Sequence, residues 1–239
     1  MIINHKPTTV LILTHRDNIT NELVVPHLEW LEFYNPDVRV EIISDVDDSI
    51  SRDEAWRNGD RKLRNWWKVH GQSIDSDTIA IFEWDTLMKG ELPSLPYGLD
   101  LAGKWVYKMG QHWNWWSEAS RMECDPIGLV SFGAFFMKRW VLDAISQDKW
   151  NETFDKDIIN ELRFPSVAKA EGAIIGIMDL PFVDWKEVKL GDEMGLYHGI
   201  KQSHQIPNKK EEKDPKELDQ DQQIVLRSAN ANNQANGTN

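Results

Sequence analysis

Two carboxylates stand at the end of an apolar segment in the first half of the chain. Residues 79–85 read Ile-Ala-Ile-Phe-Glu-Trp-Asp, so Glu83 and Asp85 directly follow a run that is typical of a buried strand. Carboxylates at such a position are costly to desolvate unless they are paired, hydrogen-bonded or bound to a cation. Their oxygen atoms suit Mg²⁺ or Mn²⁺ bridging a diphosphate. The alternative is a solvated strand end, because Asp is common in turns.

Tryptophan is the other residue type that stands out, with 12 in the chain. Trp113, Trp115 and Trp116 lie in the segment Gln-His-Trp-Asn-Trp-Trp at residues 111–116. Indole rings stack on sugar faces, and they are also ordinary core material. Trp113 and Trp115 alternate as strand neighbours do, so we expect them to share one face. A substrate-binding role on a sugar ring is one hypothesis for this cluster.

A group of basic residues lies at helical spacing in an otherwise acidic chain. It comprises Arg61, Lys62, Arg64 and Lys68. A role facing a diphosphate is one hypothesis, and a solvated helix face is the simpler interpretation.

The composition narrows the class of protein. The chain has 27 Lys and Arg against 39 Asp and Glu, a net charge of −12, which argues against a nucleic-acid binder. A single cysteine, Cys124, excludes an internal disulfide framework and a CxxC zinc cluster. The apolar run at residues 10–13 is too short for a signal sequence, and no window approaches a membrane span. We therefore expect a cytoplasmic protein without a membrane span.

The elements that must position these side chains alternate along the first half of the chain. Strand patterns at residues 8–14, 38–43 and 78–82 alternate with helix patterns at 21–34 and 53–70. This order predicts an α/β fold with a mixed, mainly parallel central sheet flanked by helices. Ligands of such sheets bind at the carboxyl ends of the strands. No GxGxxG follows the first strand and no GxxxxGK[ST] is present, which counts against a dinucleotide fold and a P-loop NTPase.

The second half of the chain is less regular. Strand patterns cover residues 98–109, 128–137, 172–177 and 182–189, and helix patterns cover residues 138–147 and 154–170. From residue 203 onward the chain has no Trp, Phe or Tyr, so it cannot bury enough apolar surface to offset the entropy of ordering. We therefore predict one folded domain over residues 1–202 and a disordered polar tail over residues 203–239.

The succession of elements that ends in Glu83-Trp84-Asp85 resembles the GT-A nucleotide-sugar glycosyltransferases. In that family the acidic triplet is the DxD motif, whose last Asp holds a divalent metal on the donor diphosphate. The resemblance implies a Rossmann-related sheet, Mn²⁺ or Mg²⁺ as the cofactor, Asp85 as a metal ligand, and donor contacts for Glu83 and Trp84. It also implies nucleotide contacts after the first strand, where the chain carries Thr14, His15, Arg16 and Asp17. A helix cap is the alternative for Asp17.

Two later segments extend the resemblance. Residues 132–139 are similar to the small-residue strand that carries the acceptor floor, which implies substrate contacts at Gly133 and Ala134, with tight packing as the alternative for Gly133. Residues 196–201, Leu-Tyr-His-Gly-Ile-Lys, are similar to a C-terminal His-x-Gly-x-Lys element. The resemblance there implies a metal role for His198 and a diphosphate contact for Lys201.

A third segment implies the catalytic base. Residues 160–168 are similar to an acidic helix start whose carboxylate accepts the proton of the acceptor hydroxyl. Glu161 matches that position best, Asp157 and Glu171 are its rivals, and a surface Glu on a helix is the alternative.

The resemblance as a whole implies a metal-dependent glycosyltransferase. The expected donor is a nucleotide-diphosphate sugar, with UDP-sugars first, the acceptor is a carbohydrate, and the reaction inverts if Glu161 is the base. A sugar-nucleotide nucleotidyltransferase is one alternative, although residues 14–21 contain no Gly for a phosphate loop. A non-catalytic carbohydrate-binding module is the other, and it leaves Asp85 and His198 without a role.

Overall fold

The computed structural model describes residues 8–14, 24–44, 51–130, 133–183 and 188–200. The chain divides into two compact units, Met1–His204 and Gln205–Asn239, and the second lies wholly outside the described residues. The predicted tail lies there too. Of the residues implied in nucleotide and diphosphate binding, His15, Arg16, Asp17 and Lys201 are also outside the described residues.

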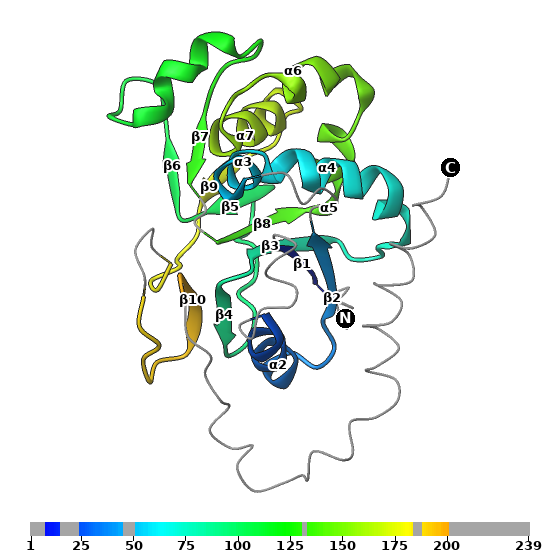
Figure 1. The fold of residues 1–239 in the computed structure, drawn as a ribbon, viewed down its shortest axis with the longest axis vertical. Helices are drawn as coiled ribbons and strands as arrows, with labels where there is room; N and C mark the ends of the chain where they lie inside the picture. Colours follow the sequence, from blue (N-terminus) through cyan, green and yellow to red (C-terminus); the bar gives the residue numbers. More distant parts are fainter. Residues whose placement is uncertain (1–7, 15–23, 45–50, 131–132, 184–187, 201–239) are drawn as a thin grey trace, which may run out of the picture. The chain divides into compact units, whose positions relative to one another are not determined.

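A six-stranded mixed sheet organises the first unit, in the order β2-β1-β3-β8-β5-β9 (Figure 1). Its strands are β1 (Thr9–Thr14), β2 (Arg39–Ser44), β3 (Thr78–Glu83), β5 (Leu101–Gly103), β8 (Ala134–Lys138) and β9 (Ile175–Ile177). β1 runs parallel to β2 and β3, and β5 runs parallel to β9. Only β8 is reversed within this sheet, because it pairs antiparallel with β3 and β5. The predicted mixed, mainly parallel sheet is therefore confirmed.

Helices cover both faces of this sheet (Figure 1). They are α4 (Gly59–His70), α5 (Arg139–Ile145) and α7 (Asn160–Ala170) on one face and α2 (Val24–Tyr34) on the other. Ile79 and Ile81 of β3 pack into the core with the first group, whereas Ala80 and Phe82 pack into the core with α2. Side chains alternate between the two faces of a strand. Glu83, the last residue of β3, consequently lies on the side of α4 and α7.

The described part of the unit also contains two small sheets and several short helices. β4 (Thr86–Lys89) pairs antiparallel with β10 (Gly195–His198), and β6 (Trp105–Tyr107) pairs antiparallel with β7 (Gly128–Val130). The short helices are α3 (Arg52–Arg57), α6 (Asn151–Asp155) and the 3-10 helices η1 (Gly71–Ser73), η2 (Asn114–Arg121) and η3 (Asp148–Trp150). Within the described ranges, no helix has the length and apolar character that crossing a bilayer requires.

Several predicted elements differ from the structure. The predicted strand at 128–137 divides into β7 and β8, with Gly133 at a φ of +83° just before β8, and the strand at 98–109 divides into β5 and β6. The predicted helix at 154–170 divides because Lys156 and Ile159 take extended ψ angles of 143° and 138°. The described residues of the predicted strand at 182–189 are not in a strand, and the tryptophan segment enters η2. The prediction that Trp113 and Trp115 are neighbours on a strand is therefore wrong.

Candidate metal centre and adjoining pockets

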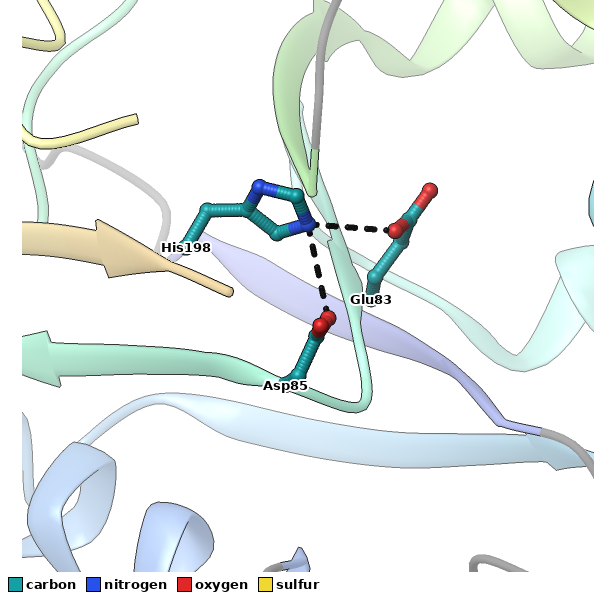
Figure 2. A group of neighbouring side chains, drawn as sticks. All are labelled: Glu83, Asp85 and His198. Carbon is teal, nitrogen blue, oxygen red and sulfur yellow. Dashed lines mark hydrogen bonds and ion pairs between the residues drawn. The ribbon is translucent and has the colours of Figure 1, made fainter. Parts of the chain in front are cut away.

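Three side chains that could ligate a metal ion come together at the end of β3. Glu83 is the last residue of β3, Asp85 lies in the turn to β4, and His198 ends β10. Figure 2 shows the three side chains pointing toward one another. Their ligand atoms all lie within 4.8 Å of one another. Nε2 of His198 is 3.3 Å from Oε2 of Glu83 and 3.4 Å from Oδ1 of Asp85.

Strand pairing brings the histidine to the two carboxylates, across 115 residues of sequence. His198 lies opposite Thr86 in the β4–β10 register. The backbone N–H of Ile200 donates to the carbonyl of Asp85 at 3.1 Å, which ties the segment after β10 to the turn after β3. Next to His198, the ring of Tyr197 stacks on Phe182 at 4.5 Å between centroids. The position of the imidazole is therefore set by both backbone pairing and side-chain packing.

The electrostatics of this cluster suit a cation. Asp85 and His198 are buried, with 3% and 7% of their surfaces exposed. Burial lowers the pKa of His198, but its hydrogen bonds to Asp85 and Glu83 and their negative charges outweigh burial and raise the pKa to about 10. Without a metal the protonated imidazole offsets part of the negative charge of the two carboxylates. Two carboxylates and one imidazole, each offering one ligand atom, also form a donor set that fits Mn²⁺ or a similar divalent ion.

Glu161 lies in a largely apolar pocket that Glu83 also lines. The pocket is formed between the sheet, α4 and α7, and its polar members are Asp60, Glu83, Asn160 and Glu161. Glu161 is only 8% exposed. Burial, and secondarily the negative charge of Glu83, raise its pKa from 4.5 to about 8. The structure thus brings Glu161 to the same pocket as Glu83, a candidate metal ligand, and a surface position is excluded.

Buried polar contacts hold the N-terminal end of α7 in place. Arg163 is fully buried and donates to Asp60 of α4 through two nitrogens, with Nε 2.9 Å from Oδ2. Oε2 of Glu118 accepts the backbone N–H of Ile159 at 2.7 Å, which anchors the residue that directly precedes α7. These contacts fix the helix turn that carries Glu161.

The two rivals of Glu161 point elsewhere. The Asp157 side chain is 79% exposed and pairs with Arg57 at 3.3 Å. Glu171 accepts from the Trp150 indole at 2.7 Å and pairs with Lys149 at 2.7 Å. Neither residue lines the pocket that holds Glu161.

A second pocket adjoins the first on the side of β1. It is lined by Leu13, Thr14, Ala55, Trp56, Gly59, Lys62, Glu83, Trp84 and Asn160. Thr14 and Trp84, two of the residues implied in donor binding, therefore share a pocket with Glu83.

Of the four basic residues for which the sequence left a diphosphate-facing role open, Lys62 is the one that lines this pocket. Its Nζ donates to the carbonyl of Thr14 at 2.9 Å, at the carboxyl end of β1. The neighbouring basic residues instead hydrogen-bond to backbone carbonyls of other segments. Arg61 donates to the carbonyl of Lys156, and Arg64 donates to the carbonyls of Ile145 and Gln147. A run of similar charges carries no signal that separates Lys62 from them, because only the tertiary fold does so.

The tryptophan cluster has a structural role. Trp113, Trp115 and Trp116 are half-buried and pack against Ile158, Ile159 and Leu162 at the start of α7. The Trp113 ring also stacks on Tyr107 at 5.2 Å. None of the three lines either of the two pockets described above. These rings support α7 and with it Glu161.

The two small residues implied in substrate contact serve different purposes. Gly133 lies against the ring of His198, so the close approach there is made by a side chain of the protein. Ala134 is fully buried in the core with Phe82 and Phe136, where its methyl group contacts protein. Gly133 therefore packs tightly, as the alternative interpretation has it, and it also lines the pocket that holds Glu161, so its contact with substrate stays a prediction.

The chain matches no protein-family model and no curated protein. Among solved structures it is similar to the galactosyltransferase LgtC in complex with donor and acceptor sugar analogs, at 10% identity and a TM-score of 0.43, over 73% of this chain and 74% of that one. A glycosyltransferase involved in the glycosylation of the major capsid of PBCV-1 is similar at 10% identity and a TM-score of 0.36, over 72% and 81%. The glycosyltransferase GlyE of Streptococcus pneumoniae TIGR4 is similar at 12% identity and a TM-score of 0.40, over 73% and 45%. These likenesses are distant, so the function must be argued from the residues of the site.

Proposed function

We propose that this protein is a metal-dependent glycosyltransferase of GT-A type. It transfers a sugar from a nucleotide-diphosphate sugar, with UDP-sugars as the expected donors, to a carbohydrate acceptor. The observation that carries the proposal is the meeting of Glu83, Asp85 and His198 at the carboxyl end of β3, beside a pocket with a buried carboxyl at Glu161. Ligands of parallel α/β sheets bind at that edge.

On the donor side, the metal ligands, a lysine and the second pocket together would bind a nucleoside diphosphate. Glu83, Asp85 and His198 would hold Mn²⁺ or Mg²⁺, which when bound neutralises charge on the leaving diphosphate. The ammonium of Lys62, at the end of β1, adds a fixed positive charge on the same side. Thr14 and Trp84 line that pocket, and we assign nucleotide contacts to His15, Arg16 and Asp17 and a diphosphate contact to Lys201.

On the acceptor side, Glu161 takes the proton of the attacking hydroxyl. Its carboxyl is buried near Glu83, and a pKa of about 8 allows an appreciable ionised fraction near neutral pH while making the ionised form a good proton acceptor. A base in this position implies direct attack on the anomeric carbon and therefore inversion. Asp157 has no part in this proposal, because its exposed side chain is paired with Arg57.

A thermal-shift panel tests the proposed donor class. The full chain is heated with each of several nucleotide sugars, with free nucleoside diphosphates and with free sugars, each with Mn²⁺ and with EDTA. A ligand that binds only the native state at 100 times its Kd stabilises it by about 2.7 kcal/mol, which is readily detected. We expect stabilisation by one nucleotide-sugar family and only with Mn²⁺. Stabilisation by free sugars alone, independent of metal, would instead indicate a carbohydrate-binding module.

A further inference from the structure

We propose that Gly133 is a positioning residue for the metal centre: its missing side chain leaves the space that the His198 ring occupies, and its carbonyl holds the segment that carries the carboxylate ligands. The inference rests on the metal site of the proposed function and adds the residue that sets the geometry of that site. Gly133 also lines the pocket that holds Glu161, but the role proposed here is to position the metal ligands and not to bind the metal.

The first observation is the contact between Gly133 and the imidazole. A Cβ built on Gly133 would lie 2.0 Å from Cδ2 and 2.5 Å from Cγ of His198. Real Cβ atoms essentially never approach another heavy atom closer than 3.0 Å. The atoms in the way belong to the body of the ring, so any side chain at residue 133 must displace the ring. Since Nε2 of His198 is 3.3 Å from Glu83 and 3.4 Å from Asp85, displacement of the ring takes the nitrogen away from both carboxylates.

The second observation is the pair of hydrogen bonds to the Gly133 carbonyl. The backbone N–H of Glu83 donates to it at 2.8 Å, and Oγ1 of Thr86 donates to it at 2.8 Å. These two donors flank the turn that contains Asp85. Thr86 is also the residue opposite His198 in the β4–β10 register. The segment that carries Glu83 and Asp85 and the strand that carries His198 therefore meet at Gly133.

The backbone conformation of Gly133 also favours glycine at this position. Its φ of +83° lies in the left-handed region, which glycine adopts without steric cost and other residues rarely adopt. The chain offers a matched control in Gly98, whose φ is +82° and whose Cβ would meet nothing within 4 Å. Alanine at residue 98 therefore bears the same backbone strain as alanine at residue 133, without the contact to the imidazole.

The first test is the affinity of the full-length protein for Mn²⁺ alone, measured by calorimetry on wild type, Gly133→Ala and Gly98→Ala. Substitution of residues that orient metal ligands typically lowers metal affinity by about 10- to 100-fold. We expect a loss of Mn²⁺ affinity in that range for Gly133→Ala. Gly98→Ala should bind Mn²⁺ like wild type. If Gly133→Ala also binds like wild type, the positioning role is refuted while the metal site stands. If wild type itself does not bind Mn²⁺, the proposed metal site fails and this inference fails with it.

The second test measures directly whether the imidazole of His198 coordinates the metal. In wild type saturated with Mn²⁺, electron spin echo envelope modulation should detect the ¹⁴N of a coordinated imidazole, and His198→Ala supplies the reference without that nitrogen. We expect the nitrogen modulation to disappear in Gly133→Ala and to persist in Gly98→Ala. Persistence in Gly133→Ala would overturn the proposal. If Gly133→Ala does not fold, Thr86→Val replaces it, because this change keeps the side-chain shape and removes the hydrogen bond to the Gly133 carbonyl. We expect about a tenfold loss of Mn²⁺ affinity there, and unchanged affinity would overturn the proposal.

Discussion

Replacing Glu161 by Gln tests how burial shifts the ionisation of this carboxyl, which lies in the pocket beside the candidate metal centre. The change keeps the size of the side chain and removes its ionisation. Burial, and then the charge of Glu83, raise the pKa of Glu161 from 4.5 to about 8. Between those two values the folded protein keeps a proton that the unfolded chain has released. The stability that this proton contributes to the metal-free protein is therefore fully present below pH 4.5. It falls as the pH rises and reaches its minimum near pH 8.

The size of the effect follows from proton linkage. One extra proton bound by the folded state corresponds to a loss of about 1.4 kcal/mol of unfolding free energy per pH unit. Between pH 5 and pH 7, wild type should therefore lose about 2 to 3 kcal/mol relative to Glu161→Gln, whatever the constant cost of the substitution. Every other titrating group contributes equally to both proteins, so the difference between the two curves belongs to Glu161 and to groups coupled to it.

Urea unfolding in EDTA at several values between pH 5 and pH 9 measures this difference. Glu152→Gln, the same chemical change at an exposed position of α6, is the control and should follow wild type at every pH. Parallel curves for wild type and Glu161→Gln would refute the account, because the carboxyl would then ionise in the folded state as it does in the unfolded chain.

Further predictions concern the same elements. Glu161→Gln should bind donor and Mn²⁺ like wild type and lose about 10²- to 10⁴-fold in single-turnover rate, and near-normal turnover would contradict its role as the base. Mn²⁺ should bind more tightly as the pH rises from 6 toward 9, because His198, with a pKa of about 10 in the metal-free protein, must release its proton to ligate. Calorimetry in buffers of different ionisation enthalpy counts that proton, and pH-independent affinity would exclude His198 as a ligand. Lys62→Met should weaken nucleoside diphosphate binding by roughly tenfold, the size expected for one charge-assisted hydrogen bond, with little change in Tm; unchanged affinity would remove it from the donor site. Arg163→Met leaves the carboxylate of Asp60 buried without its partner and should cost about 3–5 kcal/mol in urea unfolding, and a loss near zero would contradict the pairing.

The first half of the fold could be predicted from the sequence because the residue pattern of each segment matches the element that it forms. The strands at the centre of the sheet are continuous apolar runs, and helix patterns with polar loops separate them. The second half could not be predicted at the same level, because its breaks depend on tertiary contacts. Gly133 lies just before β8, inside the predicted strand at 128–137, with a left-handed backbone and with the His198 ring in the space beside it. The predicted helix at 154–170 divides near Ile159, whose backbone N–H donates to Glu118 from a distant segment.

Prediction of the candidate site from the sequence is likewise limited by tertiary contacts. Asp85 and His198 could be proposed from short motifs, but their separation in space could not, because the pairing of β4 with β10 is not visible in either segment alone. Glu161 could be proposed from its segment, whereas its burial depends on the Arg163–Asp60 ion pair and on the tryptophan cluster. The number of tryptophans in the sequence does not indicate that three of them, Trp113, Trp115 and Trp116, pack against the start of α7.

Metal-dependent nucleotide-sugar binding at Asp85 is the central claim, and calorimetry tests it most directly. Wild type, Asp85→Asn and Asp157→Asn are titrated with the UDP-sugar that stabilises wild type best, each with Mn²⁺ and with EDTA. The account predicts that wild type and Asp157→Asn bind only with Mn²⁺, since the Asp157 side chain is exposed and outside the pockets. Asp85→Asn should remain folded and show no Mn²⁺-dependent binding, because it loses a buried carboxylate ligand. Unchanged Mn²⁺-dependent binding by Asp85→Asn would contradict the account.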